Sequence, residues 1–144
     1  MKVVVDANIF ISAIINQKGR IHEVFAISRN KRKFFTPSIL LEEIRRHKTK
    51  IISYTYLTVG EFDEILNFLL SRIKVIEDSS IPVELRRKAL LLLKNIDEED
   101  ATYIALTMYL NAKLWTGDKK LISGLKKKNF DSFISVNELL NLIS

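Results

Sequence analysis

Short continuous apolar runs recur along the chain and predict the strands of a buried sheet. The first run, three valines at 3–5, is β-branched throughout, which is typical of a strand covered on both faces. Further short runs predict strands at 34–35, 73–76, 113–116 and 133–136. The sequence therefore predicts five strands.

The segments between these runs carry apolar residues at helical spacing. They predict helices at about 20–29, from 37, from 58, over 83–94, from 97, through 121–125 and from 138. Thr58 and Glu61 have the spacing of a capping box, and Thr36 followed by Pro37 predicts an N-cap and a first helical position. The leucines at 90–93 predict a helix pressed deep against its neighbours.

Strands that alternate with helices indicate an α/β fold. We expect a central, mostly parallel sheet of four to five strands, flanked by helices and joined by right-handed crossovers. A length of 144 residues is usual for one domain, and four glycines, two prolines and no repeat give no sign of a linker. The sequence therefore predicts a single domain over residues 1–144.

The amino-acid composition excludes several kinds of functional site. The chain has no cysteine, which excludes disulfides and thiolate sites, and its two histidines argue against a histidine metal site or a Ser-His-Asp hydrolase. The chain has 23 Lys and Arg residues against 17 Asp and Glu residues, a net charge of +6. This excess of positive charge suggests a polyanionic partner, although charges spread over a solvated surface are the alternative explanation. The longest apolar run, 89–93, is too short to span a bilayer, and the N-terminus lacks a signal-peptide pattern. We expect a soluble, cytoplasmic protein with no membrane partner.

Two acids follow predicted strands. Asp6 ends the first strand, and Asp118 comes one glycine after the strand at 113–116. Ligand sites in open parallel sheets form at the carboxyl ends of strands, so we expect both carboxylates to face one crevice. A turn or N-cap role is an alternative for Asp118, whereas a turn role explains Asp6 less well.

A third acid, Glu43, lies on a predicted helix and points inward by helical phase. At about 100° per residue, it falls between Ile39 and Leu40 on the apolar side, whereas Glu42 points to solvent. A buried carboxylate needs a cation or a metal beside it, so a buried ion pair is the alternative to a ligand role.

A fourth acid, Asp100, lies in the acidic first turn of another predicted helix. Asp97 is the expected N-cap of that helix and Asp100 its third residue, at the edge of the apolar face. The alternative role for Asp100 is to complement the helix dipole. Four acids that all face one crevice are less readily explained by separate capping roles.

At these positions the chain resembles the PIN-domain nucleases, a family that includes the VapC-type toxins of prokaryotic toxin–antitoxin pairs and several RNA-processing and decay nucleases. The resemblance runs nearly end to end. It is carried, in order, by Val-Val-Val-Asp6-Ala-Asn8, by Pro37 through Leu41-Glu42-Glu43-Ile44, by Asp97-Glu-Glu-Asp100-Ala-Thr-Tyr-Ile-Ala105-Leu, and by Leu114-Trp-Thr116-Gly-Asp118.

The resemblance implies a metal-dependent ribonuclease that cleaves RNA endonucleolytically. In the family, four acids hold one or two divalent cations, usually Mg²⁺ or Mn²⁺. These catalytic and metal-binding acids correspond to Asp6, Glu43, Asp100 and Asp118 in this sequence. Supporting polar positions correspond to Asn8, Asp97 and Thr116.

The chemistry of such a site follows from its oxygen ligands. Carboxylates brought together repel one another, and a hard cation relieves that repulsion. Oxygen ligands without nitrogen or sulfur favour Mg²⁺ or Mn²⁺ over zinc. We expect the cation to lower the pKa of a water, to position it for in-line attack on a phosphodiester, and to offset charge on the leaving oxygen.

Basic residues near the acids are candidates for binding the substrate. Lys119 and Lys120 directly follow the last predicted acid, and Arg45 and Arg46 follow the predicted glutamate. His47, on the same face one turn further, is expected to pack at the helix end. A preference for single-stranded or looped RNA is implied by the resemblance alone.

The resemblance leaves several biological roles open. The chain is a candidate toxin of a type II toxin–antitoxin pair, with an antitoxin protein as partner. The alternatives are a housekeeping RNA-processing nuclease and a catalytically silent PIN module that binds RNA or protein. Many relatives dimerise, so a homodimer is a candidate assembly.

Overall fold

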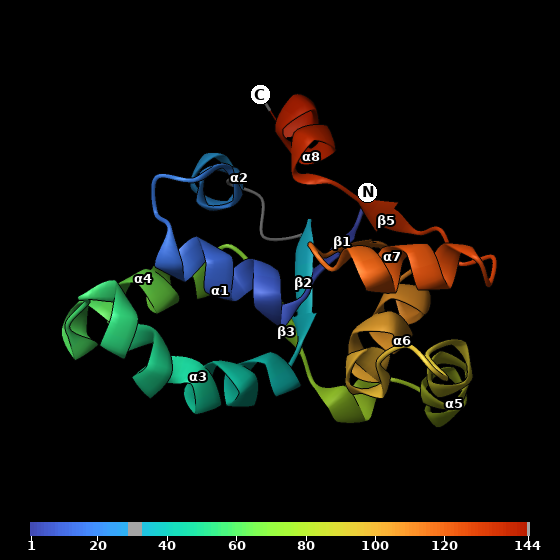
Figure 1. Cartoon of the computed structure of the whole chain (residues 1–144). Helices are drawn as coiled ribbons and strands as arrows, with labels where there is room; N and C mark the ends of the chain where they lie inside the picture. The colour runs from blue at the N-terminus through green and yellow to red at the C-terminus, as the bar shows by residue number, and fades with distance from the viewer. Residues whose placement is uncertain (29–32, 144) are drawn as a thin grey trace.

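The three valines at 3–5 form the central strand of one parallel sheet. Within residues 1–28 and 33–143, which this computed structural model describes, five strands pair in the order β3-β2-β1-β4-β5 (Figure 1). Every pairing is parallel, so the predicted sheet is confirmed. The strands are β1 (Val3–Val5), β2 (Phe34–Pro37), β3 (Lys74–Ile76), β4 (Lys113–Trp115) and β5 (Phe133–Ile134).

Helices cover both faces of the sheet. Those of the described residues are α1 (Ala7–Ile15), α2 (Arg20–Ile27), α3 (Ile39–Thr55), α4 (Val59–Leu70), α5 (Val83–Leu92), α6 (Ala101–Tyr109), α7 (Lys119–Lys126) and α8 (Val136–Ile143), with short 3-10 helices η1 (Asp78–Ser80) and η2 (Glu98–Asp100). Figure 1 shows α1 to α4 on one side of the sheet and α5 to α7 on the other. The last helix, α8, packs against α2. Among the described residues, no helix is long and apolar enough to cross a membrane.

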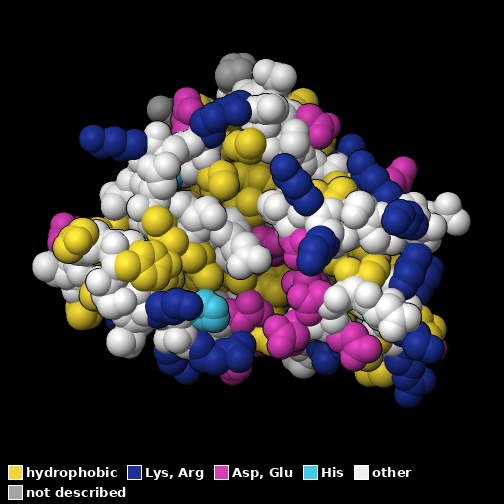
Figure 2. All heavy atoms as spheres, in the orientation of Figure 1, with side chains coloured by type: hydrophobic (Ala, Val, Ile, Leu, Met, Phe, Trp, Pro, Cys, Tyr) yellow, Lys and Arg dark blue, Asp and Glu magenta, His cyan; other side chains and the backbone are white. Residues whose placement is uncertain are grey.

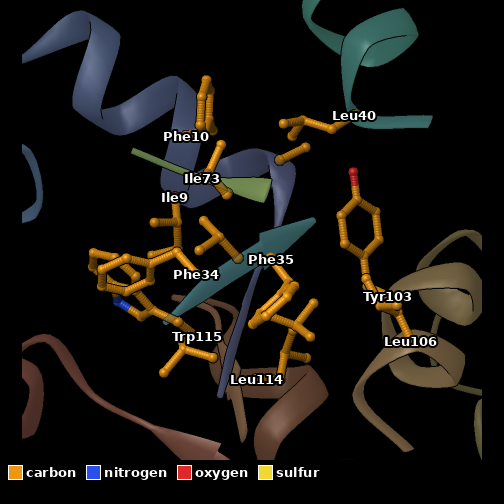
Figure 3. Close-up of a cluster of buried hydrophobic side chains, with 14 of the residues drawn as sticks. Ile9, Phe10, Phe34, Phe35, Leu40, Ile73, Tyr103, Leu106, Leu114 and Trp115 are labelled. Atoms are coloured by element: carbon orange, nitrogen blue, oxygen red, sulfur yellow. The ribbon is translucent and has the colours of Figure 1, made fainter. Parts of the chain in front are cut away.

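Aromatic packing holds α1 and α2 against the sheet. The Phe25 ring of α2 lies 5.6 Å from Phe34 of β2 and 5.3 Å from Trp115 of β4, measured between centroids. Phe10 of α1 packs edge-on against Phe25 at 5.9 Å, and all four rings are buried. Figure 3 shows Phe34 and Trp115 on the opposite side of the strands from Tyr103. Such aromatic pairs add roughly 0.5–1.5 kcal/mol each beyond burial, which anchors the helix that starts directly after β1.

The start of α3 differs from the prediction. Thr36 and Pro37 were expected to begin this helix, and that is wrong, because β2 extends through Pro37 and Ser38 is the N-cap residue. The Thr36 hydroxyl instead donates to the Val5 carbonyl at 3.0 Å, a bond between neighbouring strands. The first backbone N–H of α3, that of Ile39, donates a 3.3 Å hydrogen bond to Oδ1 of Asp78. The helix that carries Glu43 is thus anchored by a residue from beyond β3.

Two other helices also differ from the prediction. The sequence pattern predicted no helix at 7–15, yet α1 forms there, because Ile9, Phe10, Ala13 and Ile14 make one buried helical face. The predicted helix at 20–29 is α2 up to Ile27, and its expected end at 29 lies outside the described residues.

The helix predicted at 83–94 ends earlier and is not deeply buried. Ala89 and Leu93 are buried, whereas Leu90 and Leu91 are 45% and 73% exposed. Because α5 packs on α6 as an outer layer, only one of its faces meets the core.

Helix caps explain two further boundaries. Thr58 and Glu61 form the predicted capping box at the start of α4, which confirms that prediction. Ser135 and Glu138 exchange equivalent bonds at 3.1 Å, so α8 begins at Val136 rather than at 138.

Candidate active site

The first predicted acid, Asp6, is buried between β1 and α1. Its side chain is only 4% exposed, and its Oδ1 accepts a hydrogen bond from Ile9 N at 2.9 Å as the N-cap of α1. Asp6 therefore has an N-cap role that the sequence pattern did not predict, because no helix was expected at 7–15. That bond occupies part of the capacity of one carboxylate oxygen, so the group can also bind a cation. Burial raises the pKa of Asp6, against the hydrogen bonds from Thr116 and Ile9 N that lower it.

Two of the other acids cap helices: the predicted N-cap role of Asp97 is confirmed, and the alternative N-cap role of Asp118 applies. Asp118 caps α7 through a 3.1 Å bond from Leu121 N, and Asp97 accepts a 3.1 Å bond from Glu99 N at the start of η2. Asp100 occupies the N-cap position of α6 but makes no side-chain cap bond. Asp100, whose alternative role was to complement the helix dipole, therefore uses neither carboxylate oxygen for a capping bond.

One cavity of about 350 Å³ brings the predicted acids together at the carboxyl ends of β1 and β4. Its lining residues come from α1, α3, η2, α6 and the turn after β4: Asp6, Ala7, Asn8, Ile39, Glu43, Arg46, His47, Asp97, Glu99, Asp100, Tyr103 and Asp118. Figure 2 shows Asp and Glu side chains gathered on this face, in the region between α3 and α6.

Three of these acids approach most closely. One carboxylate oxygen from each of Asp97, Asp100 and Asp118 lies within 4.8 Å of the others. A divalent cation whose oxygen ligands stand about 2.0–2.6 Å away separates opposite ligands by about 4–5 Å, so the spacing of this donor set fits a divalent cation. Asp6 and Glu43 line the same cavity but do not belong to this group, whereas Asp97, which was predicted only to support the site, does.

The charge on Asp100 is strongly affected by this arrangement. Burial, followed by repulsion from Asp97, Asp6, Asp118 and Glu43, raises the pKa of Asp100 to about 7. A carboxyl group with such a pKa holds a proton near neutrality unless a cation replaces it. A carboxyl group with a strongly raised pKa among other acids in a cavity is typical of a functional site.

Glu43 points into the cavity from α3. Its Oε1 accepts a 3.1 Å hydrogen bond from the hydroxyl of Tyr103 on α6. Burial raises the pKa of Glu43, while the Tyr103 bond and the charge of Arg46 lower it. Glu42 is exposed, as the helical phase predicts.

Tyr103 is a site residue that the sequence did not single out. It is buried, and Figure 3 shows its hydroxyl directed towards α3. A signal was present, because Tyr103 lies three residues after Asp100 and so shares its helical face. Burial and the negative charge of Glu43 raise the pKa of Tyr103, so the hydroxyl stays protonated and remains a donor.

The predicted supporting residues lie at the cavity or directly beneath it. Asn8 is exposed and lines it. Thr116 is buried; its Oγ1 accepts a 3.2 Å bond from Asp118 N, and its side chain hydrogen bonds Asp6. Thr116 therefore connects the ends of β1 and β4.

The basic candidates divide into two groups. Arg46 lines the cavity, whereas Arg45, Lys119 and Lys120 are exposed residues that do not line it. His47 was expected to pack at the helix end, and that is wrong, because it is exposed and lines the cavity beside Arg46.

The fold and the cavity define an α/β domain with a candidate metal site at the carboxyl ends of parallel strands. Over residues 4–136 the sequence matches the family model described as PIN domain. The chain therefore belongs to the PIN-domain family, whose members are generally nucleases that use divalent metals and act on nucleic acid.

A solved structure has the same fold. The crystal structure of PAE2754 from Pyrobaculum aerophilum superimposes with a TM-score of 0.71 at 20% sequence identity, over 99% of this chain and 89% of that one. At this identity the likeness shows the fold alone. A search of the curated proteins found no match.

Proposed function

We propose that this protein is a metal-dependent ribonuclease that cleaves RNA phosphodiester bonds endonucleolytically. The observation that carries the proposal is the group of Asp97, Asp100 and Asp118, whose carboxylate oxygens lie within 4.8 Å of one another. Membership of the PIN-domain family supports a nuclease. An acidic cavity within a chain of net charge +6 supports a polyanionic substrate that meets its acids through cations.

The acids would hold one or two Mg²⁺ or Mn²⁺ ions. Asp100 and Asp118 lie in the closest group, with Asp6 and Glu43 on the surrounding wall. A divalent cation bound there would supply activation of an attacking water and neutralisation of charge on the phosphate. Asp97 adds a third carboxylate beside Asp100.

The surrounding residues hold the acids in place. Tyr103 restrains the Glu43 carboxylate by its hydrogen bond, and Thr116 links Asp6 to the backbone of Asp118. Such outer contacts keep ligands in the geometry that a small cation requires. None of these residues needs to form a covalent bond to the substrate.

The substrate would meet positive charge at the rim. Arg46 lies on the cavity wall, beside Glu43 and within reach of a phosphate that enters the site. Lys119 and Lys120 remain predicted phosphate contacts on the exposed start of α7. An Arg side chain suits phosphate because its planar fork donates two parallel hydrogen bonds.

The test is cleavage of a mixed-sequence single-stranded RNA with Mn²⁺, with chelator, and by Asp6→Asn in Mn²⁺. We expect cleavage in the first case only, with the rate for Asp6→Asn lower by at least about 100-fold, because several kcal/mol of charge stabilisation depend on the ligands. A second variant, Glu43→Gln, should also slow cleavage, and Glu42→Gln is its matched control, since only Glu43 lines the cavity. Equal cleavage in all three cases would overturn the metal mechanism, and no cleavage in any would favour a silent binding module.

The toxin role is carried by the sequence resemblance. It predicts growth arrest when the protein is expressed alone in the cytoplasm, and copurification with a small antitoxin protein when the pair is expressed together. Normal growth and translation during strong expression would favour a housekeeping nuclease. A homodimer would appear as a doubled mass in sedimentation equilibrium.

A further inference from the structure

One face of α3 continues from the acidic cavity to the far end of the helix. Glu43, Arg46, His47, Lys50 and Tyr54 follow one another at intervals of one, three or four residues and lie within one side of the helix. Glu43 is half-buried at the cavity. The other members of the face are exposed: Arg46, His47, Lys50 and Tyr54. At about 1.5 Å per residue, this face extends roughly 16 Å from the acids to the tyrosine.

The basic side chains on this face form no salt bridge within the described residues, although the charge of Arg46 acts on Glu43. Lys48, on another side of α3, pairs with Asp63 of α4 at 2.8 Å and lies over the Phe62 ring. Within residues 1–28 and 33–143, Arg46 and Lys50 form no such ion pair. Figure 2 shows Lys and Arg side chains and a histidine next to the acidic group, where Figure 1 draws α3.

Two exposed tyrosines lie at the far end of α3, one on this face and one just beyond the helix. Tyr54 is 50% exposed, and Tyr56, the residue just beyond α3, is 95% exposed. Tyr56 has φ 61°, in the left-handed region where glycine or asparagine usually ends a helix. A tyrosine at this position carries backbone strain without gaining packing, which points to a use outside the fold.

We propose that this face of α3 binds a single strand of nucleic acid as it leaves the acidic cavity. Arg46 and Lys50 would contact successive phosphates, and the rings of Tyr54 and Tyr56 would stack on bases. Stacking of this kind needs bases that are free of a duplex, which selects a single strand. Because it takes the bound strand to be the substrate, this inference rests on the proposed nuclease function.

The test measures binding separately from cleavage. A fluorescein-labelled single-stranded RNA is titrated with the full chain in chelator, and binding is followed by fluorescence anisotropy. We expect Arg46→Ala/Lys50→Ala to raise Kd by about tenfold or more and to reduce the slope of log K against log salt by about 1.4, or about 0.7 for each phosphate that is no longer neutralised. Arg87→Ala/Lys88→Ala removes equal charge from exposed positions on α5, across the sheet, and should change Kd less than twofold.

The aromatic part has its own pair of variants. Tyr54→Ala should weaken binding by at least about fivefold, whereas Tyr54→Phe keeps the ring and should bind as the natural protein does. Tyr109→Ala, at a residue of similar exposure (45%) on α6, is the control. Parallel titrations with DNA of the same sequence and with duplex RNA show whether sugar and strandedness matter. Tighter binding of the single strand supports the proposal, and DNA that binds as tightly as RNA would mean that the face recognises phosphates and bases only.

Two outcomes would overturn the inference. One is unchanged affinity in both Arg46→Ala/Lys50→Ala and Tyr54→Ala, and the other is duplex binding as tight as single-strand binding. If Tyr54→Ala changed the mass in sedimentation without changing RNA affinity, the face would instead be a protein interface. A protein that binds RNA through this face but never cleaves it would refute the ribonuclease proposal alone.

Discussion

The hydroxyl of Tyr103 donates a 3.1 Å hydrogen bond to Oε1 of Glu43 and so joins α6 to α3 across the acidic cavity. Tyr103 rises from the helix that follows Asp100, and Figure 3 shows its ring extending from α6 towards α3. The bond fixes the position of the Glu43 carboxylate on α3 relative to α6. The geometry of the site therefore depends on how α3 and α6 pack on the sheet.

Tyr103→Phe should weaken the site without unfolding the protein. Loss of one partly buried hydrogen bond should lower the free energy of unfolding by about 1 kcal/mol, because the ring and its packing remain. Glu43 then loses its restraint, and Mn²⁺ affinity should fall by about tenfold, as for other residues that orient metal ligands. Isothermal titration with Mn²⁺ measures this change, and Tyr109→Phe is the control. Unchanged Mn²⁺ affinity would show that the hydrogen bond does not position Glu43.

Without a cation, the protein should lose stability as the pH rises. The pKa of Asp100 is about 7 in the folded protein against a usual value of 3.8, so the folded state holds the extra proton between these values. Stability from this group is therefore complete below about pH 4 and is lost as the pH rises through about 7. Because Asp100 is partly exposed and water screens the repulsion, we expect a loss of about 1–2 kcal/mol.

Asp100→Asn should remove this pH dependence. In chelator at pH 8, the variant should melt at a higher temperature than the natural protein, whereas Glu98→Gln, an exposed neighbour that does not line the cavity, should not. Thermal unfolding by circular dichroism at pH 4, 6 and 8 measures both. If the natural protein and Asp100→Asn had the same pH dependence, repulsion among the acids would be too weak to matter.

Asp6 should have a structural role and a chemical role that substitution can separate. Asn is a good N-cap residue, so Asp6→Asn should keep stability within about 1 kcal/mol of the natural protein. Asp6→Ala loses the 2.9 Å bond to Ile9 N at a buried position, which should lower the free energy of unfolding by about 0.5–2 kcal/mol more. Urea unfolding compares the two variants. Equal stability of the two would mean that the cap at α1 contributes nothing measurable.

A bound cation should stabilise the fold and reverse the effect of high pH. At a Mn²⁺ concentration about 100 times its Kd, linkage predicts an increase of about 2.7 kcal/mol in the free energy of unfolding. The melting temperature should rise with Mn²⁺ in the natural protein and in Glu98→Gln, but not in Asp100→Asn. Equal stabilisation of all three would place the cation elsewhere.

The sequence predicted those features that depend on local pattern. The valines at 3–5, the capping box of Thr58 and Glu61, and the inward phase of Glu43 each follow from short-range rules, and each agrees with the structure. The positions of Asp6 and Asp118 at the ends of parallel strands were also predictable, because strand order brings those ends to one edge.

Other features depend on interactions between distant segments. Asp78 anchors the first turn of α3 from 39 residues away, and Thr36 bonds a neighbouring strand, so the local pattern placed the helix start too early. Tyr103 meets Glu43 only after α3 and α6 have packed on the sheet. Leu90 and Leu91 are apolar yet exposed, because α5 is an outer helix and packs against α6 with only one of its faces.

Cleavage by Asp100→Asn tests the central claim most directly. Asp100 belongs to the closest group of carboxylates and makes no capping bond, so its replacement should change the metal site more than the fold. With Mn²⁺ and a labelled single-stranded RNA, we expect the natural protein and Glu98→Gln to cleave at similar rates and Asp100→Asn to be slower by at least about 100-fold, with all three inactive in chelator. Cleavage by Asp100→Asn at the natural rate, or cleavage that persists in chelator, would contradict the account.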